Sequence, residues 1–251
     1  MTRGLRATAR LARLAGFTIC CVLPHLIARR GGRPSPWPRH FLAGAAKRAG
    51  FDVKIAGQPL EDQIFLVANH ISWVDILALG GATGCAFIAR DDVEHAPIVG
   101  WLARQNNSIF VAREKRGAVA GQVARVRAAM AAHQPVALFP EGTTGDGVTL
   151  RPFKPALFAV LSPPPRAVRV QPVLIDYGAA SRDMGWAEGE SGLANARRIL
   201  GRRGRTGVTL HLLAPFDPGA YPDRKALAAE AKARIATAWA ARQGMIPPAA
   251  P

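Results

Sequence analysis

The sequence predicts an α/β fold in which a mostly parallel central sheet is flanked by helices and preceded by a basic N-terminal helical segment. Three observations predict it. Short continuous apolar runs such as residues 64–68 are typical of strands buried on both faces. These runs alternate with stretches patterned as helices, as in α/β folds. A chain of 251 residues with 49% hydrophobic content is long enough to bury one sizeable core.

The first 60 residues are strongly basic, with eleven Lys or Arg against the single acidic Asp52, a net charge of +10. An apolar stretch at 14–27 lies between basic flanks, is interrupted by Pro24 and His25, and lacks a signal-peptide cleavage pattern. We expect a membrane-associating helix that lies on or shallowly inserts into an anionic lipid surface. The basic flanks favour the cytoplasmic face of the inner membrane. The alternative is a helix packed on the protein's own core.

We divide the chain into a basic N-terminal helical segment and linker at 1–60, an α/β domain at 61–222, and a C-terminal helix and tail at 223–251. Three prolines within 31–38 mark the linker, which leads to a short helix at 39–48. The expected strands are 64–68, 85–89, 108–112, 136–139, 168–175 and 208–213. The expected helices are 72–79, 97–104, 118–133 and 223–242.

Two segments carry further expectations. Residues 181–205 form either a surface loop or a helix near 191–200. In the last helix, Leu227, Ala231, Ile235 and Trp239 recur every four residues, which favours core packing over membrane contact. The tail after residue 244 is expected to be disordered. The three cysteines have neither metal-ligand nor disulfide spacing, which fits a reducing compartment.

A histidine follows the first expected strand of the α/β domain directly. His70 comes two residues after the strand, and a helix begins close behind it, so its imidazole is expected at the edge of the sheet. Its ordinary pKa near 6.5 suits a general base. Asp75 can fold back to accept the other ring N–H, which would orient the imidazole. Asn69 and Ser72 between them offer either substrate contacts or a helix cap.

No covalent nucleophile is apparent, since the sequence has no Gly-x-Ser-x-Gly elbow and no cysteine in a reactive setting. The base should therefore activate a substrate hydroxyl. A second constellation follows the strand at 136–139, where Glu141 and Gly142 begin a glycine-rich turn that can present backbone N–H groups to a ligand. Glu141 could bind a substrate hydroxyl or hold a cationic side chain such as Arg113.

These residues form four motifs in order: Asn69-His70-x-Ser72-x-x-Asp75, then 109–113, then 139–143, then 170–173. In order and spacing they resemble the motifs of the glycerophospholipid acyltransferase family, and within it the bacterial 1-acylglycerol-3-phosphate acyltransferases. The matched region runs from about 64 to 175. The resemblance implies a lysolipid acceptor, a donor that is acyl-CoA or acyl-acyl carrier protein, and no metal or redox cofactor.

The resemblance also implies residue roles. His70 deprotonates the lysolipid hydroxyl, Asp75 orients it, and Arg113 contacts the acceptor's phosphate or other head group. The remaining residues assigned to substrate binding are Asn69, Ser72, Phe139, Pro140, Glu141, Gly142, Thr143 and Pro172, the last lining the acyl region.

Two departures from the family pattern bear on the acceptor. The chain has Arg90-Asp91-Asp92 where a lysine is common, and Phe153-Lys154-Pro155-Ala156 where Phe-Lys-x-Gly is common. We expect 1-acylglycerol-3-phosphate as acceptor, giving phosphatidic acid, with lyso-ornithine lipid as the alternative. A non-catalytic peripheral membrane protein is a second alternative. Nucleic-acid binding is not expected, because the basic segment interleaves with apolar residues and not with stacking aromatics. The oligomeric state is left open.

Overall fold

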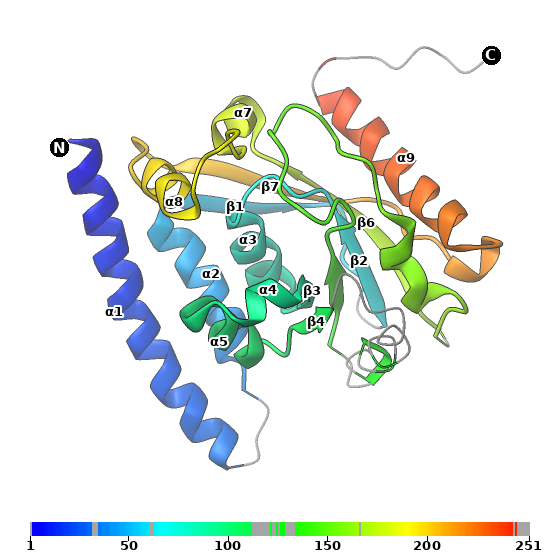
Figure 1. Cartoon of the computed structure of the whole chain (residues 1–251), viewed down its shortest axis with the longest axis horizontal. Helices are drawn as coiled ribbons and strands as arrows, with labels where there is room; N and C mark the ends of the chain where they lie inside the picture. The colour runs from blue at the N-terminus through cyan, green and yellow to red at the C-terminus, as the bar shows by residue number, and fades with distance from the viewer. Residues whose placement is uncertain are drawn as a thin grey trace.

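The computed structural model describes residues 2–31, 35–60, 63–111, 121, 124, 126–128, 134–165, 167–242 and 244. Within these residues a seven-stranded sheet has the order β1-β7-β6-β2-β5-β3-β4 (Figure 1). Every neighbouring pair is parallel except β6 and β7. The strands are β1 Phe51–Ala56, β2 Ile64–Ala68, β3 Ala86–Arg90, β4 Ile109–Val111, β5 Val136–Leu138, β6 Arg169–Asp176 and β7 Thr206–Leu212. The mostly parallel α/β fold expected from the sequence is confirmed.

Helices connect and cover the strands. The α-helices are α1 Arg3–Arg30, α2 Trp37–Ala49, α3 Val74–Thr83, α4 Asp91–Glu94, α5 Pro97–Gln105, α7 Ser181–Met184, α8 Gly192–Leu200 and α9 Arg224–Arg242. In the part of the chain that the structure describes, the 3-10 segments are η2 Pro155–Leu161, η3 Gly178–Ala180 and η4 Pro218–Ala220. The segment left open at 181–205 contains both a turn of helix, α7, and a regular helix, α8, whose N-cap Ser191 accepts a hydrogen bond from the backbone N–H of Ala194.

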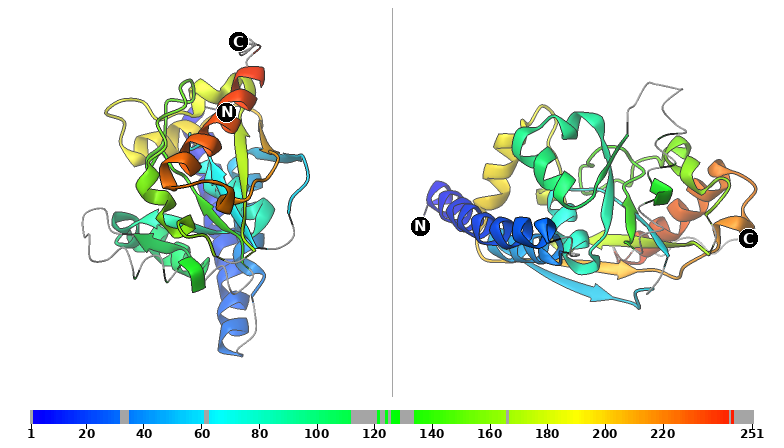
Figure 2. Two further views of the ribbon diagram at one scale, coloured as in Figure 1. Left: turned by 90° about the vertical axis from the view of Figure 1, so that its right-hand side faces the viewer. Right: turned by 90° about the horizontal axis from the view of Figure 1, so that it is seen from below.

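The two faces of the sheet bury separate apolar cores. Beneath α2, α3 and α8 the core includes Leu42, Leu79 and Ile199. Beneath η2 and α9 it includes Phe158 and Ile235. In the right-hand view of Figure 2, α1 (dark blue) lies toward one end of the molecule and α9 (orange to red) toward the other. The apolar stripe of α9 does pack on the core, as its four-residue spacing indicates.

The sheet begins before residue 61, where the sequence analysis placed the start of the α/β domain. Strand β1 pairs in parallel with β7 at the edge of the sheet. Its residues alternate between apolar Phe51, Val53 and Ile55 and exposed, charged Asp52 and Lys54, because one face of the strand packs against the core while the other faces solvent. A search for continuous apolar runs overlooks such a strand.

Helix α1, expected from the sequence as a membrane-associating helix, is continuous through Pro24. A proline removes one backbone hydrogen bond but can be accommodated in a long helix that is packed along one side. The helix is long and apolar enough, by length and composition, to cross a membrane. It lies along α2 at one side of the molecule (Figure 1). One side of α1 buries Ala7 and Cys21, while Ile19 and Leu23 remain exposed.

Two arginines of α1 serve the protein's own structure. Nε of Arg6 donates to the carbonyl of Gly201 at 2.9 Å, and Nη1 of Arg10 donates to the carbonyl of Leu200 at 3.0 Å. These carbonyls end α8, where cations are favourable. The basic residues that the sequence analysis assigned to lipid head groups are therefore partly used to dock α1 on α8.

Two expectations fall on segments outside the described residues. The helix expected at 118–133 is described only at 121, 124 and 126–128, which are helical. The tail is described only at residue 244 beyond α9.

Candidate active site

The candidate site lies where the carboxyl ends of three neighbouring strands meet. His70 follows β2, Phe139 follows β5 and Tyr177 follows β6. Because β2 is parallel to both neighbours, all three residues lie at the same edge of the sheet. This is the edge where α/β folds gather functional groups.

The structure brings His70 and Asp75 together. Nδ1 of His70 lies 2.9 Å from Oδ2 of Asp75, and the His70 side chain retains 16% of its exposure while Asp75 retains none. A carboxylate can only accept at this contact, so the proton belongs on Nδ1. The lone pair is then on Nε2, which is the arrangement a general base requires.

Asp75 is fully buried and accepts hydrogen bonds from four donors. Besides His70, its Oδ2 accepts the backbone N–H groups of Ile71 at 2.7 Å and Ser72 at 2.9 Å. Its Oδ1 accepts the hydroxyl of Tyr177, which is also buried. A buried carboxylate without such donors would be costly, so these bonds hold both its charge and its position.

Tyr177 was not identified from the sequence. It lies one residue beyond β6, on the same sheet edge as His70 but more than a hundred positions away in the chain. The pKa of Tyr177 is raised well above its ordinary value, mainly by burial and to a lesser extent by the charge of Asp75. The phenol therefore stays protonated and donates its hydrogen bond. The one feature of the sequence that could have pointed to Tyr177 is its position directly after an expected strand.

Asn69 and Ser72 are buried and bonded to the protein itself. The Asn69 amide donates from Nδ2 to the carbonyl of Ile175 at 3.1 Å and accepts the N–H of Ile175 at 2.7 Å, tying the end of β2 to β6. The Ser72 hydroxyl accepts the N–H of Val74 at 3.4 Å, at the start of α3. Both side chains therefore support the loop that carries His70, and contact of either with substrate stays a prediction.

Phe139 forms one wall of the site. Its ring stacks on the His70 imidazole with centroids 4.1 Å apart and planes 17° from parallel. Its other stacking partner is Phe87, at 5.8 Å. The imidazole is thus fixed by stacking on one side and by the Asp75 bond at Nδ1.

Glu141 holds the backbone of His70 in place. Its Oε1 accepts the His70 N–H at 2.8 Å, and its Oε2 accepts the N–H of Arg151 at 3.2 Å. Burial raises the pKa of Glu141 to about 7, against the opposing effect of these two hydrogen bonds. The Glu141 side chain thus ties its own motif to that of His70 through the backbone.

The glycine-rich turn after Glu141 closes around His70. Gly142 has φ of +71°, a conformation that favours glycine, and a side chain there would come within 2.9 Å of Nζ of Lys154. Further along, the N–H of Gly145 donates to the carbonyl of His70 at 2.8 Å. The turn therefore bonds to both backbone groups of His70, to the carbonyl through Gly145 and to the N–H through Glu141.

The other residues assigned from the sequence are dispersed. Pro140 is buried and Thr143 is exposed on the turn. Pro172 is buried in the interior of β6, opposite Val67 of β2, and so lies within the sheet and not at its edge. Arg113 lies outside the described residues. Within the described residues, no group of three or more His, Cys, Asp or Glu side chains could hold a metal ion.

This fold and this site define the acyltransferase class, and the chain belongs to the acyltransferase family. A family model described as Acyltransferase matches residues 52–176. The chain is an acyltransferase enzyme of a family that acts on lysolipids, and the resemblance seen in its four motifs is confirmed.

Similar proteins are named for two kinds of acceptor. The lyso-ornithine lipid O-acyltransferase of Rhodobacter capsulatus is 31% identical over 90% of this chain and 85% of its own length. That of Rhizobium meliloti is 37% identical over 75% of this chain and 64% of its length. The 1-acyl-sn-glycerol-3-phosphate acyltransferase of Neisseria gonorrhoeae is 31% identical over 51% of this chain and 52% of its length.

A solved structure shares the fold. The 1-acyl-sn-glycerophosphate (LPA) acyltransferase PlsC from Thermotoga maritima superposes with a TM-score of 0.67 at 20% identity, covering 97% of this chain and 95% of its own.

Proposed function

We propose that the protein O-acylates lyso-ornithine lipid, with His70 as the general base. The observation that carries the mechanism is the His70–Asp75 pair, in which Nδ1 is bonded to a buried carboxylate and Nε2 is available. In the proposed reaction Nε2 takes the proton of the acceptor hydroxyl as its oxygen attacks the thioester carbonyl of the donor. The C–S bond then breaks, and the imidazolium returns the proton to the departing thiolate. Asp75 stabilises the imidazolium between the two steps.

The choice of acceptor rests on how much of the chain each group of relatives covers. The relatives named for lyso-ornithine lipid match between 75% and 90% of this chain. Those named for 1-acyl-sn-glycerol-3-phosphate match 51% of it. The second candidate acceptor is 1-acylglycerol-3-phosphate, which the motif pattern favoured.

The donor and the location belong to the same proposal. We take the donor to be acyl-CoA or acyl-acyl carrier protein, since a thioester needs no activation beyond a deprotonated acceptor. The exposed apolar residues of α1 between basic ends support association with the cytoplasmic face of the inner membrane. Arg113 remains our candidate for contact with the head group.

The test is a thiol-release assay on purified protein in mixed micelles, with lyso-ornithine lipid, lysophosphatidate and lysophosphatidylethanolamine as acceptors. We expect turnover with lyso-ornithine lipid and a loss of at least about 100-fold in kcat for His70→Ala, since general-base catalysis contributes about 10²–10⁴-fold. His40→Ala, an exposed histidine of α2, is the matched control and should keep full activity.

Activity that survives His70→Ala in a folded protein would overturn the mechanism. Turnover with lysophosphatidate alone would overturn the proposal that lyso-ornithine lipid is the acceptor. Binding to liposomes without thiol release from any acceptor would favour a non-catalytic membrane protein.

A further inference from the structure

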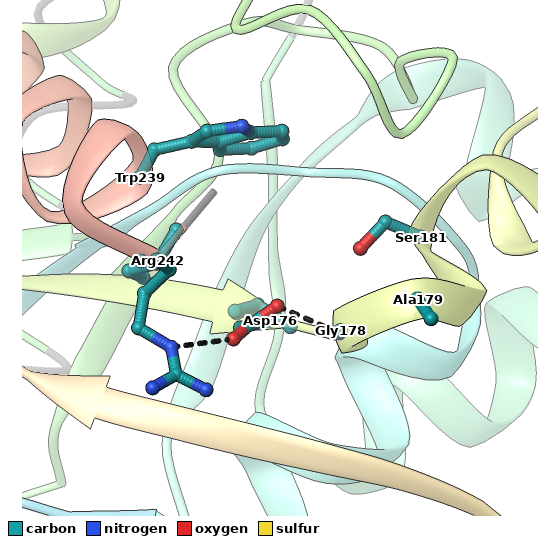
Figure 3. Close-up of a pocket in the computed structure, with 8 residues that line it drawn as sticks. Asp176, Gly178, Ala179, Ser181, Trp239 and Arg242 are labelled. Atoms are coloured by element: carbon teal, nitrogen blue, oxygen red, sulfur yellow. Dashed lines mark hydrogen bonds and ion pairs between the residues drawn. The ribbon is translucent and has the colours of Figure 1, made fainter. Parts of the chain in front are cut away.

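A pocket of about 340 Å³ lies beyond the end of β6, on the face of the sheet that α9 covers. It is lined by the end of β6, by the η3–α7 segment and by the last turn of α9 (Figure 3). Its size falls in the range of roughly 300–1,000 Å³ typical of small-molecule sites. None of its polar side chains is used by the catalytic pair.

The pocket combines groups of both charges with an aromatic ring. The Asp176 carboxylate is largely buried and accepts Nε of Arg242 at 3.1 Å and the N–H of Gly178 at 2.7 Å. His211 of β7 lies 3.6 Å from the same carboxylate. Figure 3 shows the Trp239 indole, the Ser181 hydroxyl and the Asp176 carboxylate on three sides of one space.

The polar groups have capacity for a ligand. Arg242 uses Nε for Asp176, and its two Nη groups make no hydrogen bond to the residues that the structure describes. The Ser181 hydroxyl likewise has no hydrogen-bond partner within the described ranges. A guanidinium can bind a carboxylate through its Nη groups, while a carboxylate beside an indole face attracts an ammonium group.

The pocket adjoins the catalytic edge through the backbone. Ala68 of β2 pairs with Val173 of β6, so continuing the parallel register brings His70 level with Ile175, a residue of the pocket wall. Asn69 bonds both backbone groups of Ile175. On the other side, Ser181 packs on Gly147, in the turn whose Gly145 bonds to His70.

We infer that this pocket binds an amino-acid head group that carries one ammonium and one carboxylate. Asp176, the Trp239 ring and the Ser181 hydroxyl oxygen receive the ammonium, and the Nη groups of Arg242, on the other side of Asp176, receive the carboxylate (Figure 3). A phosphate head group could pair with Arg242, but it carries no ammonium to offset the charge of the Asp176 carboxylate. The inference rests on the proposed function for its substrate: ornithine acylated on one amino group keeps one ammonium and one carboxylate, whereas lysophosphatidate has no ammonium.

The first test measures binding without catalysis. Saturation-transfer NMR on the full chain in detergent should detect Nα-acetyl-L-ornithine, and an equal concentration of glycerol 3-phosphate should not displace it. The signal should persist in His70→Ala, so a failure of the proposed catalysis and a failure of this site are distinguishable. It should be lost in Asp176→Asn and Arg242→Gln.

The second test measures substrate preference. In Arg242→Gln and Asp176→Asn, kcat/KM for lyso-ornithine lipid relative to lysophosphatidate should fall by about tenfold or more, mainly through KM, as expected for the loss of a hydrogen bond to a charged group. Arg242 lies at the exposed end of α9, so its substitution should leave folding intact. Arg224→Gln, the same change at the exposed start of α9, is the matched control and should alter neither acceptor.

Acetylornithine binding that is absent in the wild type, or unchanged in both variants, would overturn the assignment. So would an equal loss of activity toward both acceptors in Arg242→Gln. Wild-type binding of the probe in a protein that lacks transferase activity would uphold the pocket and refute the proposed function.

Discussion

At the scale of single residues, the hydrogen bonds of Asp75 hold the candidate site in its geometry. Its two oxygens accept two backbone N–H groups, an imidazole N–H and a phenol hydroxyl. The two backbone bonds fold the chain after His70 into the loop that leads into α3. The imidazole bond sets the tautomer of His70. The Tyr177 bond fixes the remaining oxygen, so we expect Tyr177 to act as a positioning residue through Asp75.

Replacing Tyr177 by Phe should lower kcat by about tenfold with little change in KM, because Asp75 loses one of its anchors while the acceptor site is untouched. The loss of one hydrogen bond to a charged group should also lower the free energy of unfolding by about 1.5–3 kcal/mol. Steady-state kinetics and urea unfolding measure the two effects. Tyr221→Phe, the same change in the other tyrosine of the chain, is the control.

If Tyr177 had a purely structural role, Tyr177→Phe would lower the free energy of unfolding and leave kcat unchanged. The pH profile separates the two cases, since a positioning role acts on the imidazole. If kcat/KM of Tyr177→Phe shows the wild-type pH profile and magnitude, the positioning role is refuted.

At the scale of elements, α1 has two different sides. One side docks on α2 and α8 with help from Arg6 and Arg10. The other exposes a row of large apolar side chains, in which Ile19 is 72% and Leu23 64% exposed. Single exposed apolar residues are ordinary, but a row along one helix is a surface for association with lipid.

Leu23→Asp should weaken binding to vesicles of anionic phospholipid by at least about tenfold, because burying a leucine side chain in the bilayer contributes roughly 1.5–3 kcal/mol. Vesicle co-sedimentation measures the loss. Ile55→Asp, on the exposed edge strand β1, adds the same charge at a site 48% exposed and should bind normally. Equal losses in both variants would mean that net charge and not α1 governs binding.

At the scale of the whole molecule, the sheet brings residues that are far apart in the sequence together in one site. The ends of β2, β5 and β6 come together with His70, Phe139 and Tyr177, and Glu141 then joins two of these ends through the backbone. A carboxyl group used in this way must be buried, and burial makes the stability of the fold depend on pH.

The pKa of Glu141 is raised from its ordinary value of 4.5 to about 7 by burial. Between these values the folded protein holds a proton that the unfolded chain has released. The free energy of unfolding should therefore fall as the pH rises from about 4.5 to 7, by an amount on the order of 3 kcal/mol.

Urea unfolding of the wild type and of Glu141→Gln across this range tests the dependence. The variant cannot ionise, so its stability relative to the wild type should improve steadily as pH rises. Parallel curves for the two proteins would show that Glu141 does not titrate in this window.

The fold class, the strands with continuous apolar runs, and the pairing of His70 with Asp75 could all be predicted from the sequence. These follow from local patterns: periodicity, and a five-residue spacing that one loop can close. Strand β1 was missed because it alternates apolar and charged residues, whereas the expected strands were continuous apolar runs.

Tertiary structure decided the rest of the site. The Tyr177–Asp75 bond, the Asn69–Ile175 tie and the capture of the His70 N–H by Glu141 all join positions that are 71 to 106 residues apart. Only strand order and register bring them together. The same holds for the Asp176 pocket, whose arginine and tryptophan come from the last helix. A linear pattern specifies which residues end a strand, but the parallel sheet determines which ends are neighbours.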